Sequence, residues 1–233
     1  MSTTNTHNKL IRKIALERLS EFGCVQKGQS RLFFKDCGWY CIIIEFQPSS
    51  WAKGSYLNIG LDFNFYPRPH FAFDFNYRED GFTEFSNEEQ FADSIHAMCD
   101  SAIKKLHELM SLFSNFSSAI AAITKRRSSD AWQLYDLAVL HALNCNYTQA
   151  GKMLHSLCEE NCERDWEKER KIVAQDLLSS IQDSNQTAEK IQKLILQTRR
   201  LKKLPEIELV NVVRINQQQT MNTKLWWKTL FKR

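Results

Sequence analysis

The stretch Tyr56-Leu-Asn-Ile-Gly-Leu-Asp-Phe-Asn-Phe-Tyr66 decides the fold class of this 233-residue chain. Large apolar side chains occupy every second position, and polar or small residues stand between them. A period of two residues with one apolar face is typical of a strand in a half-buried antiparallel sheet. We therefore expect a sheet with a phenylalanine-rich face that packs against helices.

The neighbouring segments extend this sheet. Residues 39–46 are rich in β-forming side chains, and the turn Asp36-Cys-Gly38 joins them to a shorter strand over residues 31–35. Residues 67–70 connect to a further strand over residues 71–78, since their two prolines cannot donate to a ladder. The apolar side of that last strand comprises Phe71, Phe73, Phe75 and Tyr77. The expected sheet has four to five strands.

Helices are predicted before and after the strand segments in the sequence. Residues 8–22 carry an apolar stripe, and a second, longer stripe begins after a capping box formed by Ser86 and Glu89. This long helix continues to about residue 123, with a bend possible near residue 116. Its stripe comprises Phe91, Ile95, Met98, Ala102, Leu106, Leu109 and Phe113. The length and the stripe suit a helix that covers the phenylalanine face.

The second half of the sequence is predicted to be entirely helical, without strands after residue 80. Helices are expected over 131–145, 148–161, 163–182, 187–203 and 206–231. The polar segment 125–130 is the expected boundary, and Asp130 is a candidate N-cap. The predicted fold class is α+β, with a sheet domain over residues 1–124 and a helical region over residues 130–233.

Charge and composition indicate a globular protein of the cytoplasm. The net charge is +4, and residues 186–233 carry eleven basic and three acidic residues, which leaves −4 on residues 1–185. No apolar stretch approaches the roughly 18 residues of a membrane span, and the polar residues 1–8 do not read as a signal peptide. Seven cysteines without a framework argue against a disulfide scaffold.

The polar side of the predicted sheet is the first candidate site. It gathers carboxylates, amides and one arginine, and Glu45 extends it. Such a set can bind a polar ligand or a partner, or carry out acid–base chemistry. A solvated outer face is the alternative. The candidate binding residues are Tyr56, Asn58, Asp62, Asn64, Asp74, Asn76 and Arg78. No catalytic residue is predicted.

A second candidate is a group of histidines and cysteines on the helices after residue 131. These side chains could hold zinc if the helices pair, although their spacing matches no zinc motif. Small core thiols are the alternative, and no metal or other cofactor is expected. The group comprises His141, Cys145, His155, Cys158 and Cys162.

Residues 131–161 resemble a single tetratricopeptide-like helix hairpin. Ala138 on the first helix stands twelve positions before Ala150 on the second, and small residues there let the helices approach closely. The resemblance implies a surface for protein interaction.

The basic C-terminal end is the last candidate. It can contact nucleic-acid phosphates, an anionic membrane surface or a partner, or form a helix that packs Trp226 or Trp227 on its own protein. The basic residues are Arg199, Arg200, Lys202, Lys203, Lys224, Lys228 and Lys232.

The first ~80 residues resemble a bacterial family of domains of unknown function. The resemblance rests on Phe22-Gly-Cys-Val-Gln-Lys-Gly28, on the Trp-led strand from Trp39 to Gln47, and on Leu57-Asn-Ile-Gly60. Some members of that family are small cytosolic or immunity-type proteins, so the resemblance implies binding rather than catalysis.

Three functions follow from these patterns. The first is a non-enzymatic protein-interaction or accessory protein of the immunity or defence type. The second is a nucleic-acid-binding accessory protein that uses the basic C-terminal helices. The third is a hydrolase or metal-dependent enzyme on the Asp/Asn-rich sheet face. The sequence holds no phosphate-binding loop, dinucleotide fingerprint, zinc-protease motif or nucleophile elbow.

Overall fold

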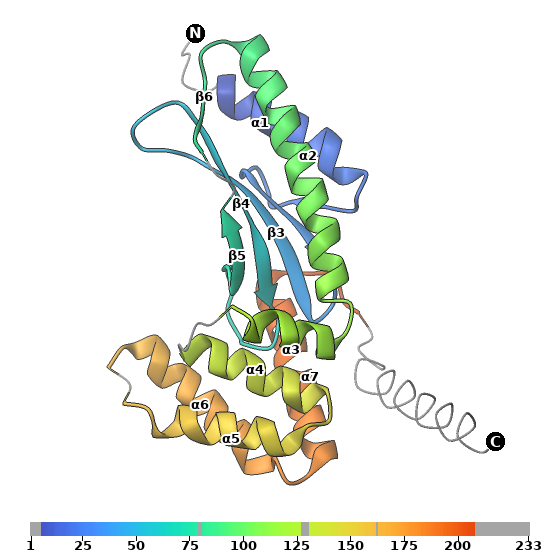
Figure 1. Cartoon of the computed structure of the whole chain (residues 1–233), viewed down its shortest axis with the longest axis vertical. Helices are drawn as coiled ribbons and strands as arrows, with labels where there is room; N and C mark the ends of the chain where they lie inside the picture. Colours follow the sequence, from blue (N-terminus) through green and yellow to red (C-terminus); the bar gives the residue numbers. More distant parts are fainter. Residues whose placement is uncertain (1–5, 79–80, 127–130, 162, 208–233) are drawn as a thin grey trace, which may run out of the picture. The chain divides into compact units, whose positions relative to one another are not determined.

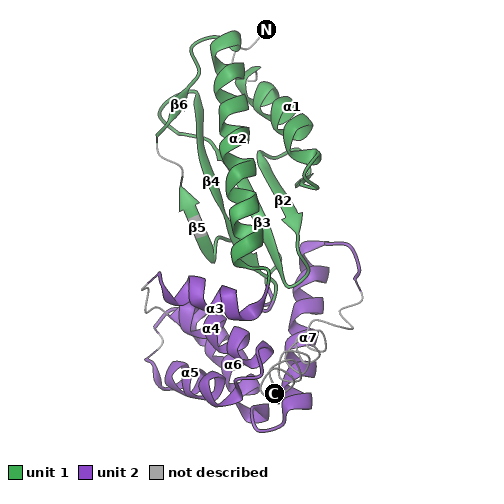
Figure 2. Cartoon of the chain, turned by 45° about the vertical axis from the view of Figure 1, so that its right-hand side comes forward, with its two compact units in different colours: residues 1–64, 68–114 green, residues 65–67, 115–233 purple. Residues whose placement is uncertain are grey.

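The computed structural model describes residues 6–78, 81–126, 131–161 and 163–207 (Figure 1). The chain divides into two compact units (Figure 2). One comprises residues 1–64 and 68–114, and the other comprises residues 65–67 and 115–233. A helix, an antiparallel sheet and then further helices follow one another along the chain, which confirms the α+β class. In the sequence, the two units meet between residues 114 and 115, before the boundary expected at residues 125–130.

Within its described residues, the first unit contains two helices and six short or medium strands. Its helices are α1 (Thr6–Ser20) and α2 (Glu88–Leu112). Its strands are β1 (Val25–Gln26), β2 (Leu32–Asp36), β3 (Tyr40–Gln47), β4 (Gly54–Phe63), β5 (Phe75–Arg78) and β6 (Thr83–Glu84).

The sheet is an antiparallel meander with the order β1-β2-β3-β4-β5, and β6 pairs with the first two residues of β4. The turn between β2 and β3 forms as predicted, since the amide of Gly38 donates to Asp36 Oδ1 at 2.9 Å. The register of β3 and β4 places Ile42 opposite Leu61 and Ile44 opposite Ile59. These side chains share one face and are fully buried.

Helix α2 runs across β3 and β4 on this apolar face, with α1 beside it (Figure 2). The ring of Phe113, at the end of α2, lies at the centre of the core that results. Ring centroids 5.2–6.4 Å away belong to Trp39, Tyr40, Phe63 and Phe75. Aromatic pairs at such distances stabilise a core beyond the area that they bury.

The predicted start of α2 was wrong by one residue. Asn87 is the N-cap, and its side chain accepts a hydrogen bond from the amide of Gln90 at 2.9 Å. Asn and Ser are about equally good N-caps, so the sequence pattern alone did not separate Ser86 from Asn87. The helix also ends at Leu112, because Asn115 caps a separate helix, α3 (Phe116–Thr124).

The predicted strand over residues 71–78 is only half formed. Residues 75–78 pair with β4, whereas residues 71–74 lie outside the ladder. The side chain of Asp74 accepts a hydrogen bond from the amide of Phe63 at 2.8 Å. The ring of Phe71 packs against Phe34 with centroids 4.9 Å apart. The two-residue strand β6 also corrects the expectation that no strand follows residue 80.

The second unit contains five helices within its described residues. After α3 these are α4 (Ala131–Leu143), α5 (Tyr147–Glu159), α6 (Asp165–Ser180) and α7 (Ser184–Lys202). Helix α4 packs on α3, α5 and α7, and α6 packs on α5 and α7. The hairpin of α4 and α5 has the predicted small contact residues, since Ala138 and Ala150 are buried. The helix predicted over 206–231 lies outside the described residues, apart from residues 206–207, which form no helix.

Arg170 is the most unusual core residue of this unit. It is only 1% exposed, and its guanidinium lies against the ring of Trp132. Its Cζ atom is 4.5 Å from the ring centroid of Tyr66 and 5.0 Å from that of Tyr135. The Tyr135 hydroxyl donates to the carbonyl of Phe65 at 2.8 Å. Cation–π contacts of this kind favour a buried guanidinium, which explains how a charged residue joins the core.

Among the described residues, none of the helices is both long enough and apolar enough to cross a bilayer.

Replacement of Phe113 by alanine should destabilise the protein by about 3–5 kcal/mol, because it empties the centre of the aromatic core. Urea unfolding monitored by circular dichroism measures the change. Leu112→Ala is the matched control, since Leu112 is the preceding residue and is 41% exposed. An equal loss of stability in both variants would contradict this description of the core.

Candidate functional site

The polar sheet face is the side of β3, β4 and β5 that lies opposite α2. We use this name for Glu45, Gln47, Tyr56, Asn58, Asp62 and Arg78, together with Asp74. The register places five of these residues on one face, because Glu45 and Arg78 both pair with Asn58 and Gln47 pairs with Tyr56. Asn76 pairs with Gly60 in the same ladder, and its side chain lies outside the described atoms.

One end of this face is a hydrogen-bonded network. The amide nitrogen of Asn58 donates to Glu45 at 3.1 Å and to Gln47 at 2.9 Å. Arg78 donates through Nε to Asn58 at 3.0 Å and also donates to Gln47. Its guanidinium lies 5.0 Å from the ring centroid of Tyr56. The amide and guanidinium groups therefore already have partners within the sheet.

The other end is a buried ion-pair group. Arg68 contacts both Asp62 and Asp74 through one guanidinium nitrogen. Asp62 is fully buried and Arg68 is 5% exposed. Burial alone would lower the pKa of Arg68, but the two carboxylates outweigh it and raise that pKa further above its usual value. Arg68 is therefore a permanent cation held between two carboxylates.

This arrangement differs from the one that acid–base catalysis requires. A general base must reach the proton of a substrate, and Asp62 has no solvent-exposed surface. Both carboxylates contact the guanidinium of Arg68. Asn64 is likewise buried, and its side-chain nitrogen donates to the carbonyl of Gly38 at 2.8 Å. We infer a structural role for these four residues.

The histidine and cysteine group is dispersed in the described helices. Cys145 lies beyond the end of α4, in a left-handed conformation with φ of 60°, and is exposed, so the expected helical pair with His141 does not form. His155 pairs with Glu159 at 3.2 Å. Cys162 lies outside the described residues. Across the described ranges, no three His, Cys, Asp or Glu side chains are placed to hold a metal ion.

Two buried thiols of the first unit are poorly suited to nucleophilic chemistry. Burial raises the pKa of Cys24 to about 11 and that of Cys99 to about 12. The thiolate is the reactive form of cysteine, so both thiols are largely unreactive at neutral pH.

The basic C-terminal residues divide between surface and interior. Arg200 and Lys203 are exposed, whereas Arg199 and Lys202 are buried. Arg199 donates to the carbonyl of Pro205 at 2.8 Å, so it ties the segment after α7 to the helix. The remaining candidates, Lys224, Lys228 and Lys232, lie outside the described residues, as do Trp226 and Trp227.

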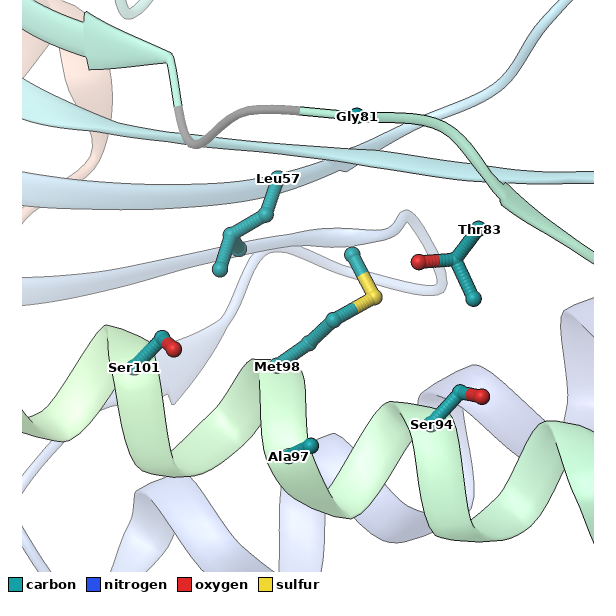
Figure 3. A pocket seen from close by; sticks show the side chains of 7 residues that line it. All are labelled: Leu57, Gly81, Thr83, Ser94, Ala97, Met98 and Ser101. Atoms are coloured by element: carbon teal, nitrogen blue, oxygen red, sulfur yellow. The ribbon is translucent and has the colours of Figure 1, made fainter.

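A pocket of about 300 Å³ opens between α2 and the strands β4 and β6 (Figure 3). Met98 projects from α2 toward Leu57, and hydroxyl side chains stand around it. The lining residues are Leu57, Gly81, Thr83, Ser94, Ala97, Met98 and Ser101. None of them carries an ionisable side chain, and Thr83, Ser94 and Ser101 give the pocket a partly polar lining.

The loop that joins β3 to β4 carries a feature that the sequence patterns did not single out. Trp51 in this loop is 95% exposed. The signal was a tryptophan between Ser49-Ser50 and Ala52-Lys53, a polar setting in which no apolar repeat predicts burial. We call residues 48–53 the hairpin tip.

The hairpin tip is held at its base. The amide of Phe85 donates to the carbonyl of Lys53 at 2.9 Å, and Arg31 donates to the carbonyl of Gly54 at 3.1 Å. Gly54 has φ of 152° and pairs with Glu84 in β6. A Cβ atom there would lie 2.1 Å from the carbonyl oxygen of Thr83, so only glycine fits.

His7 lies near the same region, at the start of α1. It is 6% exposed and packs against the rings of Phe85 and Phe91. Burial lowers its pKa, and the positive charges of Arg31 and Lys53 lower it further. The imidazole is therefore neutral in the folded protein at neutral pH.

No family model matches the chain, and no curated protein and no solved structure is significantly similar to it. The resemblance of the first ~80 residues to a bacterial family therefore stays a prediction.

Replacement of Arg68 by methionine should cost about 3–5 kcal/mol, because it leaves two buried carboxylates without their cation. Arg18→Met is the control, since it breaks the exposed Arg18–Asp100 pair, whose expected worth is at most about 1 kcal/mol. Equilibrium urea unfolding measures both. Similar stabilities for the two variants would show that the Arg68 group is not structural.

The stability of the protein should fall as the pH falls from about 6.5, partly because of His7. Its pKa is lowered in the folded state, so the unfolded chain binds the proton first and acid favours unfolding. His7→Phe should lose less stability between pH 7.5 and pH 5.5 than the wild type. Urea midpoints at both pH values measure the difference, and equal losses would count against a buried neutral His7.

Proposed function

We propose that this chain is a non-enzymatic accessory protein of the bacterial cytoplasm that binds another protein through its hairpin tip. The observation that carries the proposal is the 95% exposure of Trp51. Tryptophan buries more apolar area on binding than most residues and is enriched among the residues that dominate binding energy. An indole left in water is thus best explained by a partner that covers it.

The anchored base of the tip supports this proposal. The strand β6, the Arg31–Gly54 hydrogen bond and the close approach at Gly54 fix where the two strands end. A fixed scaffold lowers the entropy lost when the partner binds. The tip also has a local hydrogen bond, since the amide of Trp51 donates to Ser49 Oγ at 3.1 Å.

The alternatives have less support. The hydrolase or metal enzyme would need accessible carboxylates, whereas Asp62 is buried and ion-paired with Arg68. The nucleic-acid-binding alternative uses the basic C-terminal residues, of which Arg199 and Lys202 are buried while Arg200 and Lys203 are exposed. The immunity or defence role remains part of the proposal through the family resemblance alone.

The test is affinity capture from the native host with quantitative mass spectrometry. The wild-type chain, Trp51→Ala and Ile172→Ala are compared, since Ile172 is also exposed, at 64%, but lies on α6. A specific partner should be enriched by the wild type and by Ile172→Ala, and depleted at least tenfold by Trp51→Ala, as a hot-spot residue would be.

Two results would contradict the proposal. One is a captured set that is identical for the wild type and for Trp51→Ala. The other is capture of nucleic acid alone, shown by loss of all enriched material after nuclease treatment.

A further inference from the structure

Two cations lie at the base of the hairpin tip, and a third lies near one of them. Arg31 lies directly before β2 and donates to the carbonyl of Gly54, where the tip ends. Lys53 is the last residue of the tip and is exposed. Arg12 on α1 lies close enough to Arg31 for the two positive charges to repel each other. We call these three residues the basic cluster, and Lys53 stands two positions after the exposed Trp51 in the hairpin tip.

Two members of the cluster lack a neutralising contact. Arg12 donates to the carbonyls of Asn8 and Gln29 and to the side-chain oxygen of Gln29. Arg31 donates to the carbonyl of Gly54. These acceptors are uncharged, and neither guanidinium forms an ion pair with a carboxylate in the described part of the chain. Hydrogen bonds to uncharged acceptors therefore orient the two guanidinium groups, and Glu45 is a carboxylate near enough to Arg31 to offset part of its charge.

The pKa values of two nearby groups are lowered by these positive charges. The neighbouring charge of Arg12 lowers the pKa of Arg31, although burial is the larger cause and Glu45 acts in the opposite direction. Arg31 and Lys53 together lower the pKa of the buried His7. Like charges held together cost stability, and an anion placed among them would remove that cost.

The net charge of the first unit helps to distinguish between classes of anionic partner. The first unit carries 12 basic and 14 acidic residues, a net charge of −2, so its basic cluster is local. Binding of nucleic acid relies on many phosphate contacts and favours a broadly basic domain. A protein surface can instead present a few carboxylates beside an apolar pocket, which matches a few cations beside one indole.

We propose that the hairpin tip and the basic cluster together recognise an acidic segment of the protein partner. Aspartate or glutamate side chains meet Arg12, Arg31 and Lys53, and an adjacent apolar pocket of the partner covers Trp51. This inference rests on the function proposed above and adds the chemistry of the partner. The charges steer association and set specificity, while the indole supplies most of the affinity.

The experiment is a display selection of random 15-residue peptides against the full chain. Peptides selected by the wild type should be enriched in Asp and Glu. The enrichment should disappear with the triple variant Arg12→Gln, Arg31→Gln and Lys53→Gln. It should persist with the control Lys9→Gln, Lys13→Gln and Lys104→Gln, which removes three exposed cations from α1 and α2.

Selected peptides are then compared by fluorescence anisotropy at two salt concentrations. We expect at least tenfold weaker binding for the triple variant, with a smaller dependence on salt. Trp51→Ala should weaken binding without changing the salt dependence, because it removes no charge. Selected peptides without acidic enrichment would overturn the inference. So would tighter binding of a twelve-residue oligothymidine than of any selected peptide.

The two proposals fail in different ways. A partner captured through Trp51 that binds the triple variant as well as the wild type would refute the acidic segment and leave the binding function intact. Loss of every Trp51-dependent partner, together with acidic peptides that still depend on the basic cluster, would refute the proposed function at Trp51 and leave the anion specificity.

Discussion

The contact of Arg68 with Asp62 and Asp74 sets the arrangement of the sheet's second face. A buried guanidinium keeps its charge and is costly without compensating partners, and here β4 and the segment before β5 each supply a carboxylate that contacts it. The segment between them must therefore turn back over the sheet. Its ring at Phe71 consequently packs against Phe34, and the pairing of β5 is delayed to residue 75.

This constraint has a functional consequence. Polar residues that resemble a binding site in the sequence are engaged with one another, through the ion pairs at Asp62 and the hydrogen bonds at Asn58. Trp51, by contrast, is 95% exposed at the end of the β3–β4 hairpin, where Arg31 donates to the carbonyl of Gly54. A rigid sheet that presents a few recognition residues on a loop is a common division between scaffold and function.

The sequence predicted the fold where a two-residue apolar alternation corresponds to burial of one face of a strand. Alternation over residues 56–66 predicted β4 and its apolar face, although β4 itself ends at Phe63. The same alternation over residues 71–78 predicted a strand that forms only over residues 75–78. The side chain of Asp74 accepts a hydrogen bond from the backbone of β4, and a periodic pattern does not reveal such a contact. The polar neighbours of Trp51 were a usable signal of its exposure, whereas no pattern shows that Arg170 is buried, because its guanidinium lies against three aromatic rings that are distant from it in the sequence.

The central claim is that the hairpin tip, rather than the polar sheet face, meets the partner. Site-specific photo-crosslinking in the native host tests it directly, with benzoylphenylalanine placed at position 51 or at position 78. Arg78 is exposed on the polar sheet face, so both probes can reach a bound protein. We predict a discrete crosslinked protein adduct from position 51 and none from position 78. An adduct from position 78 alone would contradict the account.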